Sequence, residues 1–363
     1  MSTRSHDIIL LLGAGASAEA GIPTSADMIG RIEEFLRSDP KWTPYADLYN
    51  HVKSAIHYAG GLRGRFNDQV SYNIETLVNT LNELERNEDH PLYPFIAAWN
   101  SRFVAMAGPD FSRVKEFRRL IVEALKKWMC PEDSSEGDYY QGLVRIQESL
   151  NFPLPVFSLN YDLCVERISG PDFRVETGFG GFGPRHVWDF ERFEETNTNP
   201  LPQLLLYKLH GSINWKRDDA TKELFSVEQI ENIDSDRMEV IFGRDFKLEA
   251  ADPYLFYAYE FRRYTLMASL IVVVGYGFGD THINKMLTQG LRAQADRRLL
   301  VVCHCDENRK DEKVNEIATR LELNECESQQ LIVQLDTAKQ FLQAEELAAV
   351  LLDMVPKGTE APF

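Results

Sequence analysis

The stretch that decides the fold is Asp7-Ile8-Ile9-Leu10-Leu11-Leu12-Gly13-Ala14-Gly15-Ala16-Ser17-Ala18-Glu19-Ala20-Gly21-Ile22-Pro23. Its apolar run, Ile8 to Leu12, is typical of a buried parallel strand. Gly13 and Gly15 allow a sharp turn and let a ligand approach the backbone closely. The helix start that follows offers unpaired N–H groups and partial positive charge to a phosphate. The spacing Gly13-x-Gly15-x-x-Ala18 therefore fits the dinucleotide-binding fingerprint.

The rest of that fingerprint departs from the dehydrogenase pattern. The expected acidic residue about 20 positions later has candidates in Glu33 and Glu34, but these lie in a helical pattern and not after a strand. Gly21-Ile22-Pro23 ends the first helix within about two turns, because proline cannot continue it. We therefore expect a phosphate-binding turn that lacks the further features of the dehydrogenase fingerprint. The alternative is a tight turn that binds no ligand.

Two further apolar strands end in polar groups. They are Val156-Phe157-Ser158-Leu159-Asn160-Tyr161-Asp162 and Leu206-Tyr207-Lys208-Leu209-His210-Gly211-Ser212. Ligands of open α/β sheets bind outside the carboxyl ends of the strands. We therefore expect the glycine turn, an Asn/Asp pair and a histidine to converge. Taken singly, Asn160 and Asp162 could instead cap a helix, and His210 could be a buried core residue.

The last third of the chain alternates strands with helices, which predicts a parallel sheet. Its strands are expected near 270–274, 299–303 and 331–335. Gly275-Tyr276-Gly277 follows the first of them, where an adenosine ribose could rest. A turn that only packs a helix is the alternative there.

Residues 25–150 are mainly helical in pattern, for example Ile74, Leu77, Val78, Leu81 and Leu84 at helical spacing. We predict a Rossmann-like domain made of residues 1–24 and 151–363, with 25–150 as a helical insertion over one side of the cleft. The glycine-rich run 177–184 is either a mobile lid or a surface loop.

Composition excludes several classes of protein. The net charge of −17, from 39 basic and 56 acidic residues, argues against direct nucleic-acid binding. No apolar run reaches the roughly 20 residues of a membrane span, and five apolar residues before Gly13 are too few for a signal peptide. We expect a cytoplasmic protein without membrane attachment. The five scattered cysteines do not predict a disulfide framework.

The three motifs, in this order, resemble the sirtuin family: Gly-Ala-Gly-x-Ser with Gly-Ile-Pro, then Asn-x-Asp, then His-Gly. The resemblance implies that NAD is a substrate. It implies that Asn160 and Asp162 surround the nicotinamide ribose and that His210 is the base. It also implies that the remaining NAD contacts come from the glycine turns, namely Gly13, Ala14, Gly15, Ser17, Gly275 and Tyr276.

Departures from the sirtuin pattern weaken the case for protein deacylation. Thr24-Ser25-Ala26 replaces the usual Asp-Phe-Arg, and Leu159 stands where a glutamine is common. No cysteine lies between 164 and 303, so we expect no zinc ribbon and no bound metal. The run 275–283, Gly-Tyr-Gly-Phe-Gly-Asp-Thr-His-Ile, resembles zinc-free, NAD-degrading effectors of bacterial anti-phage defence.

The leading hypothesis is an NAD⁺ hydrolase (NADase) that releases nicotinamide and ADP-ribose in an abortive-infection system. An NAD-dependent deacylase and a regulatory NAD-binding subunit without turnover are the alternatives. By analogy we expect a homo-oligomer, with a HerA-type ATPase or another defence protein as a possible partner.

Overall fold

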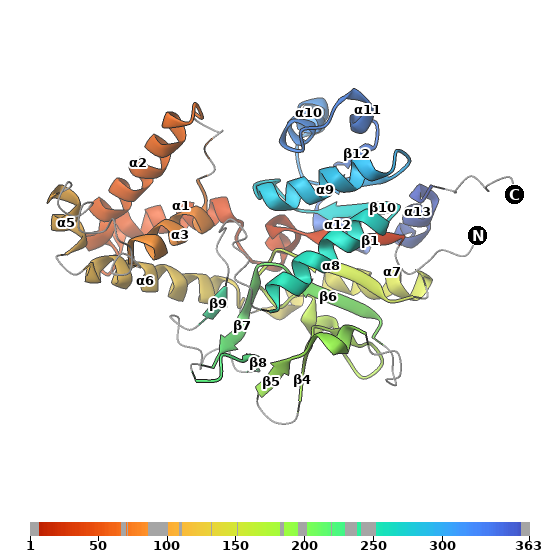
Figure 1. Ribbon diagram of the computed structural model, residues 1–363, viewed down its shortest axis with the longest axis horizontal. Coiled ribbons are helices and arrows are strands. Elements are labelled where there is room, and N and C mark those ends of the chain that lie inside the picture. Colours follow the sequence, from red (N-terminus) through yellow and green to blue (C-terminus); the bar gives the residue numbers. More distant parts are fainter. Residues whose placement is uncertain are drawn as a thin grey trace, which may run out of the picture.

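The computed structural model describes residues 7–66, 70, 72–85, 101–108, 111–131, 133–150, 152–181, 185–194, 202–218, 220–228, 238–240 and 252–356. A seven-stranded parallel sheet forms the centre of the molecule (Figure 1). Its strand order is β12 (Leu331–Gln334), β11 (Arg298–Val302), β10 (Leu270–Val274), β1 (Ile8–Leu12), β2 (Leu154–Ser158), β6 (Leu204–Lys208) and β3 (Val175–Glu176). The predicted α/β class and Rossmann-like parallel sheet are therefore confirmed.

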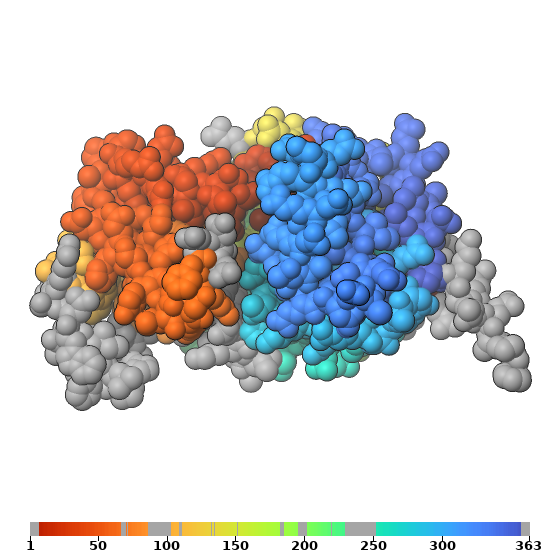
Figure 2. Space-filling view, turned by 90° about the horizontal axis from the view of Figure 1, so that it is seen from above, coloured from red at the N-terminus to blue at the C-terminus, as the bar shows by residue number. Residues whose placement is uncertain are grey.

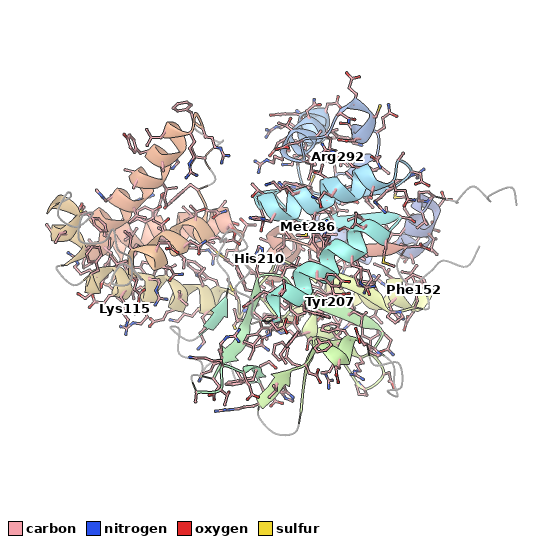
Figure 3. All side chains as sticks on the ribbon, viewed as in Figure 1. Lys115, Phe152, Tyr207, His210, Met286 and Arg292 are labelled. Carbon is pink, nitrogen blue, oxygen red and sulfur yellow. The ribbon has the colours of Figure 1, made fainter. Side chains whose placement is uncertain are left out.

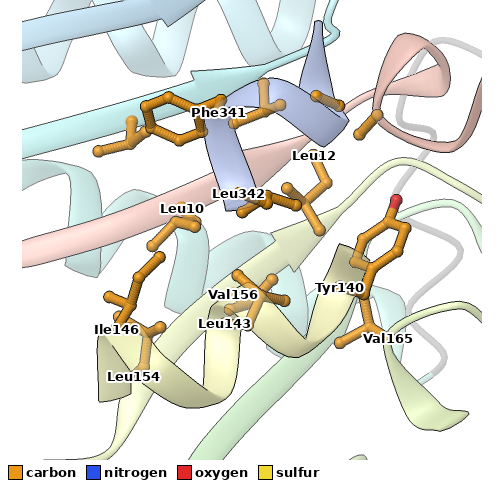
Figure 4. Packing of buried hydrophobic residues seen from close by; sticks show 14 of the residues in the cluster. Leu10, Leu12, Tyr140, Leu143, Ile146, Leu154, Val156, Val165, Phe341 and Leu342 are labelled. Atoms are coloured by element: carbon orange, nitrogen blue, oxygen red, sulfur yellow. The ribbon is translucent and has the colours of Figure 1, made fainter. Parts of the chain in front are cut away.

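Both faces of this sheet are covered, which explains why its strands are apolar along their whole length. Alternate residues of β1 enter different cores: Leu10 packs on one face and Leu11 on the other. The Leu10 face is covered by η5 (Ser134–Gln141), α7 (Gly142–Leu150), α12 (Ala338–Gln343) and α13 (Leu347–Met354). Figure 4 shows Leu143 and Ile146 of α7 against Leu154 and Val156 of β2.

The opposite face carries the aromatic-rich helix α8 and two helices from the C-terminal third. These are α8 (Tyr254–Met267), α9 (Thr281–Ala293) and α10 (Lys310–Arg320). Shorter elements join the strands: η1 (Ala14–Ala20), η6 (Glu166–Ile168), η7 (Phe190–Phe193), η10 (Glu307–Arg309) and α11 (Glu325–Ser328). As predicted, the first helix is short: η1 ends before Gly21, whose φ of 78° stops it.

Helices between β1 and β2 form a layer beside the sheet, drawn in red to tan in Figure 1. They are α1 (Ser25–Ser38), η2 (Thr43–Tyr45), α2 (Ala46–Leu62), α3 (Ile74–Glu85), α5 (Ser101–Ala107) and α6 (Ser112–Trp128). This helical layer has its own apolar core, which Tyr161 and Ile213 from the sheet side join. Because η5 and α7 pack on the sheet instead, the separately packed part of 25–150 ends near Met129.

A second, five-stranded antiparallel sheet was not foreseen from the sequence. Its order is β4 (Phe179–Gly180), β5 (Arg185–Trp188), β8 (Leu224–Val227), β7 (Gly211–Arg217) and β9 (Met238–Val240). β4 places Phe179 and Gly180 of the 177–184 run in this sheet, and none of residues 177–181 lines the cavity described below. Residues 182–184 lie outside the described part of the chain. His210 sits at the junction, two residues after β6 and one before β7.

Within the described ranges, none of the helices has the length and apolar character that a membrane span requires.

Candidate functional site

A cavity of about 1080 Å³ lies between the helical layer and the carboxyl ends of the sheet strands. Figure 2 shows the hollow between the red-to-orange helices and the blue C-terminal part. The cavity is lined by eight of the nine predicted site residues: Gly13, Ala14, Gly15, Asn160, Asp162, His210, Gly275 and Tyr276. The three predicted strand ends therefore converge, as expected for this sheet topology. Their individual roles stay predictions.

The glycines bring two turns into backbone contact. Gly13 and Gly15 donate their N–H groups to the carbonyls of Val274 and Gly275, at 2.9 and 2.8 Å. A Cβ on Gly15 would lie 2.9 Å from the Cα of Gly275, and a Cβ on Gly275 would lie 2.1 Å from the nitrogen of Ala16. Gly275 also has a φ of 66°. The glycines are thus required by close packing, and their N–H groups are engaged by protein carbonyls in this conformation.

Ser17, the ninth predicted residue, lies behind the cavity wall and is fully buried. Its hydroxyl donates to Asp162 Oδ2 at 2.7 Å and accepts from Asn160 Nδ2 at 3.0 Å. Because its single proton goes to Asp162, the 2.8 Å contact with Tyr140 is a bond donated by the phenol. Ser17 therefore fixes the two polar residues that follow β2.

Asn160 presents its carbonyl oxygen to the cavity side. Its amide nitrogen donates one proton to the Gly13 carbonyl at 3.0 Å and the other to Ser17. With both amide protons used, Oδ1 is the group left to accept a hydrogen bond from a ligand. Asp162 is more constrained, since Oδ1 accepts from the Cys164 N–H at 2.9 Å and Oδ2 from Ser17.

Lys208, the last residue of β6, holds the loop after β2 in place. Its ammonium donates to the carbonyl of Asp162, to Glu166 Oε1 at 3.0 Å and to Ser212 Oγ at 3.0 Å. All three protons are thereby used, and the residue is 1% exposed. Lys208 therefore connects the loop after β2 to the start of β7, the strand that follows His210 in the chain.

His210 lies between two carboxylates. Its Nε2 is 3.2 Å from Asp280 Oδ2, and its Nδ1 is 3.8 Å from Glu75 Oε1 on α3. Nδ1 is buried and has no hydrogen-bond partner among the residues that the structure describes. Since a neutral histidine that faces a carboxylate donates to it, Nε2 carries the proton and Nδ1 holds the free lone pair.

The charge of this histidine is strongly coupled to its neighbours. Burial disfavours the imidazolium, but the hydrogen bond to Asp280 and the negative charges of Glu75 and Asp280 outweigh it and raise the pKa of His210 above 6.5. Burial likewise acts against ionised Asp280, yet the hydrogen bond from His210 holds the pKa of Asp280 below its usual range.

Asp280 is held by the glycine-rich turn after β10. Its Oδ1 caps α9 by accepting the N–H groups of His282 and Ile283. The Tyr276 hydroxyl accepts from the Asp280 N–H at 3.1 Å and contacts Asn284 Oδ1 at 3.0 Å. Tyr276 therefore positions the residue that orients His210.

Sequence reasoning missed the roles of Glu75, Asp280 and Lys208 around the cavity. Asp280 and Lys208 lie in the quoted runs 275–283 and 206–212, but those runs assign them no role. An acidic residue shortly after the strand at 270–274 was a usable signal for Asp280. No such signal in the sequence pointed to Glu75, because its helix is far from the motifs in sequence. In the part of the chain with described coordinates, no group of three or more His, Cys, Asp or Glu side chains is placed to hold a metal ion.

Comparison with known proteins identifies a domain within the chain. Residues 155–326 match the family model described as a SIR2-like domain. The match includes Asn160, Asp162, His210 and the turn at 275–280, but not the glycine turn after β1 or α3. No curated protein matches the chain significantly.

Solved structures similar to this one include several sirtuin complexes. A Sir2 homologue–NAD complex is 13% identical, with a TM-score of 0.42, and the match covers 96% of this chain and 90% of that one. Sir2 with an inhibitor, 2'-O-acetyl-ADP-ribose and a deacetylated peptide is 12% identical, with a TM-score of 0.41 over 95% and 94% of the chains. Sir2Tm bound to a propionylated peptide is 13% identical, with a TM-score of 0.40 over 95% and 93%. Within the chain, the stretch 155–326 is therefore similar to a SIR2-like domain.

Proposed function

We propose that the protein is an NAD⁺ hydrolase that cleaves the nicotinamide–ribose bond. The observation that carries the proposal is the pairing, in one cavity of a SIR2-like domain, of an asparagine with a free Oδ1 and a carboxylate-oriented histidine. The volume of about 1080 Å³ lies at the upper end of small-molecule pockets, which leaves room for a dinucleotide.

The reaction breaks the bond between ribose C1′ and the pyridine nitrogen, and its electron pair leaves with nicotinamide. The oxygen of a water molecule bonds to C1′ and gives up a proton. Asn160 Oδ1 would accept one hydrogen bond from that water and orient it. His210, neutral at Nδ1, would take the proton through a hydroxyl or water, with Asp280 stabilising the imidazolium that results.

The fixed geometry of these groups favours turnover over binding alone. Hydrogen bonds with Ser17, Gly13 and Lys208 hold Asn160 and Asp162 in place, so we expect both to be preorganised before substrate arrives. Arg65 and Arg320 are the arginines of the cavity lining that a pyrophosphate could approach.

The test is an NAD-consumption assay with chromatography of the products. Wild type should release nicotinamide and ADP-ribose without an acylated peptide. Asn160→Ala should lower kcat by about 10²–10³, and His210→Ala by about 10²–10⁴. Turnover that requires an acylated peptide would instead indicate a deacylase. NAD binding without nicotinamide release, with every candidate activator, would indicate a regulatory subunit.

We further propose that the hydrolase is the toxic effector of an anti-phage system. An enzyme that empties the NAD pool must be restrained until it is triggered, so a homo-oligomer or a partner such as a HerA-type ATPase is expected to control it. Co-purification from the native operon tests this: a single peak that contains this chain alone as a monomer would contradict it.

A further inference from the structure

Glu75 is the carboxylate that the helical layer places beside His210 in the cavity. It lies near the start of α3, in a segment remote in sequence from the sheet, and its side chain lines the cavity with an exposed fraction of 21%. In Figure 3, His210 lies where the orange helices and the sheet meet. The 3.8 Å from Glu75 Oε1 to His210 Nδ1 spans that boundary.

Three carboxylates surround the polar centre of the cavity, and in two of them each oxygen already accepts a hydrogen bond. Asp162 accepts from Ser17 and Cys164, and Asp280 accepts from His210 and from the start of α9. In Glu75, Oε1 accepts the Tyr161 hydroxyl at 3.1 Å while Oε2 has no hydrogen-bond partner among the described residues. Oε2 of Glu75 is therefore the most readily available of these carboxylate oxygens for a ligand.

We propose that Glu75 is a catalytic residue that contacts the nicotinamide ribose and stabilises the positive charge on its anomeric carbon. This inference rests on the proposed hydrolysis. Departure of nicotinamide takes the bonding electron pair with it and leaves oxocarbenium-like charge on the ribose. The leaving group is already a cationic pyridinium and departs neutral, so no proton donor is needed. The chemistry calls instead for a fixed negative charge beside the sugar.

The surroundings of His210 fit this assignment. Nδ1 and Oε1 face each other at a distance too long for a hydrogen bond, and no described residue is a hydrogen-bond partner of Nδ1. A ribose hydroxyl could donate to one group and contact the other. Tyr161, fixed after β2, holds the carboxylate at this position through its hydroxyl.

The decisive variant is Glu75→Gln, which keeps the shape and the bond from Tyr161 but removes the charge. We expect kcat for NAD to fall by about 10²–10³, with the dissociation constant for NAD, measured by calorimetry, near the wild-type value. Glu75→Asp should recover part of the rate. Glu83→Gln, at an exposed position of the same helix outside the cavity, is the matched control and should keep wild-type kcat.

A second readout does not require turnover. NMR titration of His210 should give a lower pKa in Glu75→Gln than in wild type, with Asp280 as the remaining carboxylate neighbour. Wild-type kcat in Glu75→Gln, or an unchanged His210 pKa, would overturn the role of Glu75 alone. Absence of NAD turnover in wild type would instead overturn the hydrolase proposal.

Discussion

The two walls of the cavity are built in different ways. On the sheet side, Ser17, Asn160 and Asp162 are buried and bonded to one another and to the backbone. On the helical side, Glu75 is partly exposed and reaches the sheet through Tyr161. The first wall cannot change without breaking buried hydrogen bonds, whereas we expect the second, which is partly exposed, to shift more easily. The difference separates a preorganised part of the site from an adjustable one.

We expect the largest effect on stability from Lys208, which holds the loop after β2 on the sheet side of the cavity. Lys208→Met removes the cation from a buried pair and leaves the Glu166 carboxylate and the Asp162 carbonyl without their partner. We expect a loss of about 3–5 kcal/mol in the free energy of unfolding, measured by urea denaturation. Lys285→Met, on the exposed surface of α9, is the control and should change stability by less than about 0.5 kcal/mol. Equal losses of unfolding free energy in the two variants would mean that the hydrogen bonds of Lys208 contribute little to stability.

Ser17→Ala should be next, because three buried groups then lose a partner. We expect about 1–3 kcal/mol of destabilisation, together with slower NAD turnover as the Asn160 amide loses its orientation. Tyr140→Phe removes a single bond to the same hydroxyl and should cost about 1 kcal/mol. If Ser17→Ala were as stable and active as wild type, the sheet wall would not be preorganised by this network.

Asp280→Asn tests the link between the turn after β10 and His210. Asparagine still caps α9, but the charge that raises the His210 pKa is removed. We expect turnover to fall by about 10–100-fold.

The pH dependence of NAD turnover should also change in Asp280→Asn, in a direction that the His210 pKa sets. A base must be neutral, so wild-type activity should rise with pH through a midpoint above 6.5. In Asp280→Asn that rising limb should move to lower pH. A limb that stays in place would show that another group controls the profile.

The smallest effect should come from the helical wall. Tyr161→Phe removes the hydrogen bond to Glu75 and should cost about 0.5–1.5 kcal/mol. The change acts on the link between α3 and the loop after β2. Relative to wild type, we therefore expect amide hydrogen exchange to accelerate more in α3 than in β1 or β2. Faster exchange spread evenly over the sheet would contradict the separation into two walls.

The fold was largely predictable because the strands of the parallel sheet are uninterrupted apolar runs. The run 8–12 coincides with β1, and the helical spacing at 74–84 corresponds to α3. The antiparallel sheet was not predicted, although β7 spans seven residues, since β4 has only two and β5 alternates between exposed and half-buried residues. Pairing between distant short strands leaves little periodicity in a sequence.

The site was predictable as far as it follows strand ends. Asn160, His210 and the glycine turns converge because parallel strands present their carboxyl ends at one edge. The direction of each hydrogen bond was not predictable: Ser17 lies behind the cavity, and Tyr276 supports Asp280. Glu75 depends on how a helical layer docks on a sheet, which is set by tertiary packing and not by local pattern.

The contact between the turns after β1 and β10 also constrains how this protein can diverge. Gly15 and Gly275 occupy each other's side-chain space, and the Cα and Cβ of Tyr276 fill the space beside Gly13. Because the atoms that a new Cβ on Gly15 or Gly275 would meet belong to the backbone, no substitution at the partner position, about 260 residues away in the chain, would relieve the clash. A library that randomises these glycines, singly or in pairs, should therefore return the parent residues, whereas we expect positions of the helical layer outside the cavity to accept single substitutions.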